Sequence, residues 1–114
     1  MEYYFNGDGT KVGVLISVGY GAGWSSWCTD DIAFDKRVIE YWKNHPRASS
    51  EEVEKAMLDF GYELYAGGYS QLVLQWVPVN TYFRIDEYDG AERIEMLDLS
   101  EWHYIGEENG STAD

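Results

Sequence analysis

The chain has 114 residues, of which 45% are hydrophobic and 17% aromatic, so it is long enough for one domain with a buried core and too short for two. Its 21 acidic and eight basic side chains give a formal net charge of −13, which disfavours direct contact with nucleic-acid phosphates. The apolar runs are too short for a membrane span, the start has no signal-peptide pattern and there is a single cysteine, so we expect a cytoplasmic protein without a membrane segment or an internal disulfide.

The N-terminal part predicts a β-hairpin. Residues 3–5 are aromatic, and residues 11–18 are rich in Val, Leu and Ile, as expected of a strand buried on both faces. Residues 6–9 (Asn-Gly-Asp-Gly) form a strong turn signal between the two segments. The second strand then runs into residues 19–28, where three glycines at alternate positions precede two tryptophans. We expect this stretch to be a shaped loop rather than a spacer.

Two helices are predicted in the middle of the chain. The first begins at residues 30–31, two aspartates that suit a helix cap, and ends before Pro46, because the residue preceding proline disfavours a helix. The second begins with a capping box from Ser49 to Glu52 and ends at Gly61. Their apolar stripes are Phe34, Val38, Tyr41 and Trp42 in the first helix and Val53, Met57 and Phe60 in the second.

The C-terminal half predicts three strands, at residues 72–77, 81–86 and 93–97, with a turn at residues 88–91 between the last two. Because successive side chains of a strand point to opposite faces, Ile94 and Met96 share one face of the last strand. Arg93 and Glu95 share the other face. We expect the three strands to form a meander.

Strands at both ends of the chain, with helices between them, indicate the α+β class. The predicted architecture is an antiparallel sheet, in the order β-β-α-α-β-β-β, with two helices packed on one face. We expect a single domain over residues 1–105 and a flexible acidic tail over residues 106–114.

The alternate glycines do not match a phosphate-binding loop. A dinucleotide fingerprint needs its third glycine where this chain has Trp24, and a P-loop needs a lysine that the stretch lacks. Two interpretations remain. In the first, Gly19, Gly21 and Gly23 let the backbone approach a small ligand, and Trp24 and Trp27 stack on it. In the second, the stretch is a structural corner beside packed tryptophans.

No other set of residues predicts catalysis or metal binding. Cys28 has only His45 and His103 as partners for nucleophilic chemistry, and a buried structural cysteine is the better interpretation. One cysteine and two scattered histidines lack zinc spacing, and the acids around Asp86 lack the glycine and the final glutamate of a calcium loop. Paired carboxylates would suit a glycosidase, but acids are too common here for that pattern to be specific. We expect no enzyme activity, no cofactor and no metal.

Acidic residues are concentrated at the C-terminal end of the chain. Residues 81–114 hold ten acids, opposed only by Arg84 and Arg93. Acids on one face of a strand recur about every 7 Å, a spacing comparable to that of phosphates along DNA, and would imitate nucleic acid toward a protein that binds it. The predicted partner-binding residues are Asp86, Glu87, Tyr88, Asp89, Glu92 and Glu95. The alternative is a solvated hairpin face without a partner.

Three segments resemble those of small, functionally uncharacterised proteins encoded by tailed bacteriophages: residues 19–25 (GYGAGWS), 67–69 (GGY) and 83–90 (FRIDEYDG). The resemblance covers residues 11–97. It implies a setting in the bacterial cytoplasm and a non-enzymatic accessory role, including inhibition of a host defence such as CRISPR or restriction. The resemblance assigns no functional residue to this chain.

The leading hypothesis is therefore a small acidic interaction protein that binds a basic site on a host protein, since the charge steers such a partner toward it. The first alternative is a small-ligand binder that uses residues 19–28. The second alternative is a structural protein of virion assembly, which predicts a homo-oligomer.

Overall fold

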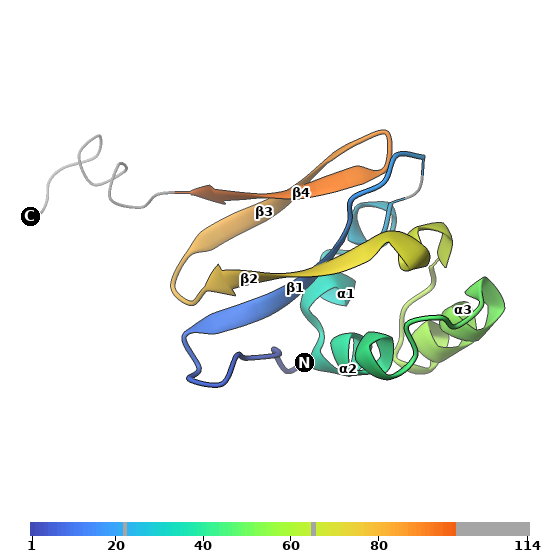
Figure 1. Ribbon diagram of the computed structural model, residues 1–114, viewed down its shortest axis with the longest axis horizontal. Helices are drawn as coiled ribbons and strands as arrows, with labels where there is room; N and C mark the ends of the chain where they lie inside the picture. Colours follow the sequence, from blue (N-terminus) through green and yellow to red (C-terminus); the bar gives the residue numbers. More distant parts are fainter. Residues whose placement is uncertain (22, 65, 98–114) are drawn as a thin grey trace, which may run out of the picture.

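The computed structural model describes residues 1–21, 23–64 and 66–97 and has three layers (Figure 1). A two-stranded antiparallel sheet lies in the middle, a β-hairpin covers one of its faces and helices cover the other. The main elements are β1 (Lys11–Ser17), α1 (Asp31–Phe34), α2 (Lys36–Asn44), α3 (Ser50–Asp59), β2 (Leu72–Pro78), β3 (Tyr82–Tyr88) and β4 (Ala91–Leu97). The predicted α+β class is confirmed. The predicted tail at 106–114 lies outside the described residues.

Strand β1 is at the centre of the molecule and contributes to two cores. Val14 and Ile16 face the β3–β4 hairpin and pack near Phe83, Ile85 and Ile94. Leu15 points the opposite way, into a larger core with side chains of α2 and α3. Since both faces of β1 are covered, the prediction of a strand buried on both faces is confirmed.

The sheet differs from the predicted single sheet in two ways. Residues 3–5 form no strand and contact their neighbours through isolated bridges, Phe5 with Val12 and Tyr3 with Asp35. The four strands form two separate two-stranded sheets, β1–β2 and β3–β4, so the predicted meander is wrong. After Pro78 ends β2, Asn80 takes a positive φ of 63°, and the chain crosses from the middle layer to the hairpin layer.

The first predicted helix is interrupted at Asp35. This residue has extended backbone angles (φ −70°, ψ 122°) and separates α1 from α2. Its side chain caps α2 by accepting a hydrogen bond from the Arg37 backbone N–H at 2.9 Å. The break sends Phe34 to the core beneath the hairpin and Val38 to the helical core, so the predicted stripe is divided.

The second predicted helix forms as its local signals indicate. Ser49 Oγ accepts from the Glu52 backbone N–H at 3.2 Å, and the Glu52 carboxylate accepts from the Ser49 N–H at 2.9 Å. Val53 and Met57 are fully buried against the sheet. Gly61 follows the helix with φ +98°, a conformation that favours glycine and ends the helix.

Candidate functional site

The loop after β1 surrounds the carboxylate of Glu92, the second residue of β4. Glu92 is 4% exposed. One carboxylate oxygen accepts from the Ser17 backbone N–H at 2.9 Å. The other accepts from the Trp24 N–H at 2.8 Å, the Ser26 N–H at 3.0 Å and the Ser26 hydroxyl at 2.5 Å. The loop is therefore an anion-binding turn whose anion is supplied by the chain itself.

Backbone conformation explains one glycine of the loop, Gly21, and close packing explains another, Gly23. Gly21 has a φ of +85°, which other L-residues rarely adopt. A side chain at Gly23 would crowd Ser26 and Trp27, whereas one at Gly19 would only require the end of the exposed Gln71 side chain to move. These requirements come from the loop itself, so they support the structural interpretation of the glycines.

The two tryptophans of the loop have opposite environments. Trp24 is fully buried in the helical core, with its ring centroid 5.9 Å from that of Tyr69. Trp27 lies at the surface, and its indole N–H donates to Glu87 at 3.4 Å. Trp24 is therefore inaccessible for stacking on a ligand, contrary to the first interpretation of the loop.

A second carboxylate connects the loop to the turn between β3 and β4. Glu87 accepts the Gly90 backbone N–H at 2.7 Å in addition to the indole of Trp27. The Gly21 N–H donates to the carbonyl oxygen of Asp89. Residues that are far apart in the sequence are thus joined into one surface.

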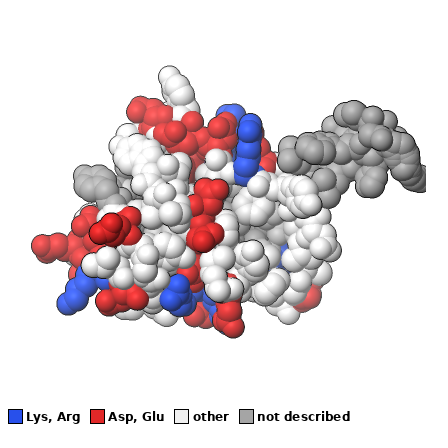
Figure 2. Space-filling view, turned by 180° about the vertical axis from the view of Figure 1, so that it is seen from behind, with Lys and Arg blue, Asp and Glu red and all other residues white. Residues whose placement is uncertain are grey.

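The acids of the hairpin do not form one uncompensated row. In the register of β3 and β4, Arg84 pairs with Glu95 and Asp86 pairs with Arg93, and all four side chains share the outer face. Arg84 contacts Glu95 at 2.6 Å, and Arg93 contacts Asp86 at 2.7 Å and Glu95 at 3.2 Å. The hydrogen bond from Arg84 is the main cause that lowers the pKa of Glu95. Figure 2 shows acidic and basic side chains next to one another at the top of the molecule, where the hairpin lies.

The predicted partner-binding residues therefore divide into groups. Asp86 and Glu95 are paired with arginines, Glu92 is buried, and Glu87 binds the loop. Glu92 is only 4% exposed and its carboxylate is occupied by donors of the loop, which corrects its place in the predicted set. The alternation of side chains along β4 is consistent with this burial. Glu92 lies on the same face of the strand as Ile94 and Met96, whereas Glu95 lies on the opposite face.

Exposed aromatic side chains cover the connection between loop and turn. Tyr20 is 70% exposed and Tyr88 76%, and their rings meet edge to face with centroids 6.3 Å apart. A hollow of about 470 Å³ lies beside them, with Asp86, Glu87 and Arg93 in its walls. Together these side chains form the tip surface, which consists of Tyr20, Trp27, Asp86, Glu87, Tyr88, Asp89 and Arg93. Tyr20 had no sequence signal beyond its place between two glycines.

The residues considered for nucleophilic chemistry have separate structural contacts. The Cys28 thiol donates to the Glu63 carbonyl oxygen at 3.3 Å, and the His45 ring stacks on Tyr41 with centroids 4.5 Å apart. His103 lies outside the described residues. Within the described ranges, His, Cys, Asp and Glu side chains form no group of three suited to a metal ion.

Comparisons with protein-family models, curated proteins and solved structures each find no match. Among the helices of residues 1–21, 23–64 and 66–97, none combines the length and apolar character that crossing a membrane requires.

Proposed function

We propose that this chain is a small acidic interaction protein that binds a basic surface of another protein through the tip surface. The observation that carries the proposal is the exposed Tyr20–Tyr88 pair beside carboxylates, on a surface fixed by hydrogen bonds that Glu87 and Glu92 accept. Exposed aromatic side chains on a preorganised support bind with little loss of conformational entropy.

The charge of the chain supports a basic partner. A net charge of −13 attracts such a surface over several ångströms and repels nucleic acid. The ring faces of Tyr20 and Tyr88 bind Arg or Lys by cation–π contacts, which nearby carboxylates strengthen. The resemblance of residues 11–97 to bacteriophage proteins supports a host protein as the partner, with inhibition of a host defence as the outcome of binding.

The small-ligand alternative is less well supported. Trp24 is buried, and the backbone N–H groups of Trp24 and Ser26 already bind Glu92. A ligand would have to occupy the hollow next to Tyr20, and neither Trp24 nor Trp27 belongs to the residues that line it. Tryptophan fluorescence titrated with nucleotides and sugars tests this alternative.

Two tyrosines on the same face of β3 provide a matched test. Tyr88 belongs to the tip surface, whereas Tyr82 lies at the other end of the strand and is 61% exposed. Proteins captured from a bacterial host lysate by the wild-type chain would be identified and their dissociation constants measured at low and high salt. We expect Tyr88→Ala to weaken binding about tenfold or more, Tyr82→Ala to leave it nearly unchanged, and high salt to weaken it.

Two results would contradict the proposal. One is the absence of a captured partner at either salt concentration. The other is a partner that binds Tyr88→Ala and Tyr82→Ala equally well.

A further inference from the structure

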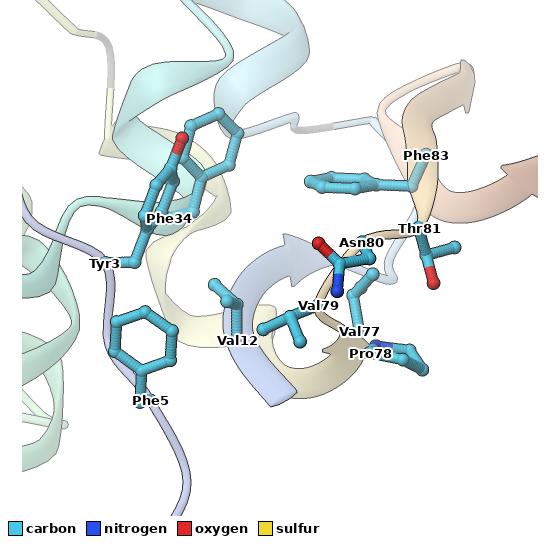
Figure 3. Close-up of a pocket in the computed structure, with 10 residues that line it drawn as sticks. All are labelled: Tyr3, Phe5, Val12, Phe34, Val77, Pro78, Val79, Asn80, Thr81 and Phe83. Carbon is cyan, nitrogen blue, oxygen red and sulfur yellow. The ribbon is translucent and has the colours of Figure 1, made fainter. Parts of the chain in front are cut away.

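An apolar groove lies at the end of the molecule away from the tip surface. It has a volume of about 300 Å³ and opens between the middle sheet and the start of β3 (Figure 3). Tyr3, Phe5 and Phe34 stand on one side and Phe83 on the other, above Val12 and Val77. The remaining lining residues are Pro78, Val79, Asn80 and Thr81.

The aromatic walls of the groove contact one another but leave its interior open. Phe34 meets Phe83 edge to face at 5.9 Å between centroids, and Tyr3 lies 5.8 Å from Phe34. Tyr3 and Phe5 remain 47% and 51% exposed. The end of the molecule where β1 begins, on the right in Figure 2, carries few charged side chains. An apolar hollow of this kind favours an apolar occupant.

The chain itself continues from the rim of the groove. Leu97, the last residue of β4, pairs with Tyr82, and the next residue of β3 is Phe83 in the groove wall. Residues 98–114 follow this point. Five residues of extended chain span about 17 Å, so the beginning of this segment can reach the groove.

The sequence of this segment matches the groove in its chemistry. Leu99, Trp102, Tyr104 and Ile105 are concentrated in its first half, and residues 106–114 are polar and acidic. We propose that the groove binds residues 99–105 of the same chain, with Trp102 as the central contact. An indole meets the rings of Tyr3, Phe34 and Phe83 in edge-to-face contacts. A short tether raises the effective concentration to the millimolar range, which favours this occupant over a second copy.

A spin label beside the groove tests the proposal in the full-length chain. In a Cys28→Ser background, Lys11→Cys places a nitroxide on the exposed first residue of β1, which pairs with Pro78 in the groove wall. Glu51→Cys places the control label on the exposed surface of α3, in the helical layer. The readout is the indole N–H signal of Trp102 in a ¹⁵N spectrum, assigned by Trp102→Phe.

We expect the label at position 11 to remove most of the Trp102 signal and the label at position 51 to leave it intact. A ¹⁵N chain without a label, mixed with labelled chain of natural isotope content, should keep its signal. No loss from position 11, or equal loss from both positions, overturns the proposal. Loss in the mixed sample also overturns it, because the occupant would then be a second copy.

Unfolding free energies provide a second test that requires no label. Trp102→Ala and Phe5→Ala should be non-additive, with the double variant losing less stability than the sum of the single variants. Trp102→Ala combined with Leu58→Ala, on the exposed face of α3, should be additive. Additivity in both pairs contradicts docking of Trp102 beside Phe5.

Discussion

The tip surface and the groove lie at opposite ends of the β3–β4 hairpin and are stabilised differently. At the tip, two carboxylates bind backbone and side-chain donors from residues far away in the sequence, so polar groups fix the positions of exposed aromatic rings. At the groove, the walls are apolar and the rings contact one another around an open volume of about 300 Å³. The rings of the tip are therefore held in place by contacts among the described residues, whereas the same residues leave the end of the core at the groove partly unfilled.

Within the loop of the tip, the two tryptophans separate the part that belongs to the core from the part that belongs to the surface. Trp24→Ala removes a fully buried indole from the helical core and should destabilise the protein by about 4 kcal/mol. Trp27→Ala truncates a partly exposed indole at the tip surface and should cost about 1 kcal/mol or less. Urea denaturation measures both values. Equal losses of stability would contradict the assignment of Trp24 to the core and of Trp27 to the tip surface.

The carboxylate of Glu92 is the next strongest determinant of the tip. Glu92→Ala removes the acceptor of the Trp24 and Ser26 backbone N–H groups and should cost about 3 kcal/mol. Glu95→Ala, two residues further along β4, removes an exposed partner of Arg84 and should cost less than about 1 kcal/mol. Urea denaturation again gives the free energies, and amide exchange of Trp24 and Ser26 should accelerate in Glu92→Ala alone. A cost for Glu92→Ala no larger than that for Glu95→Ala would contradict the structural role of the buried carboxylate.

Local signals predicted the parts of the fold that local contacts determine. The capping box of α3 and Gly61 at its end depend on residues within a few positions of each other, and both form as predicted. The burial of β1 followed from its composition alone. The break at Asp35 could not be predicted from helical spacing, because it depends on a bridge to Tyr3 and a hydrogen bond from Tyr62 at 2.7 Å.

The candidate site shows the same limit. Net charge predicted a set of acids, but their roles depend on strand pairing and on the loop. The pairing of β3 with β4 places arginines opposite Asp86 and Glu95. Glu92 lies on the inner face of β4, where it binds the loop after β1. No sequence signal joined Tyr20 to Tyr88, since 68 positions separate them and the contact exists only after the layers assemble.

A third carboxylate tests whether the groove end also depends on a buried polar group. Asp35 follows the groove residue Phe34 in the chain, and its backbone forms a bridge with Tyr3, another groove residue. Its side chain is fully buried and accepts hydrogen bonds from Arg37 and Tyr62. Burial opposes its ionisation, but the hydrogen bonds from Arg37 and Tyr62 outweigh that effect and lower the pKa of Asp35. Asp35→Asn should therefore cost about 2 kcal/mol at neutral pH.

The pH dependence of this cost follows from the direction of the shift. Because the pKa of Asp35 is lower in the folded protein, its stabilising contribution is complete above the ordinary value of about 4 and decreases as the pH falls through that value toward the folded pKa. The difference in unfolding free energy between wild type and Asp35→Asn should be constant from pH 7 to about pH 5 and shrink on further acidification. A difference that grows toward low pH would show that the carboxyl of Asp35 is bound in its protonated form, and the groove end would then have no ionised carboxylate at this position.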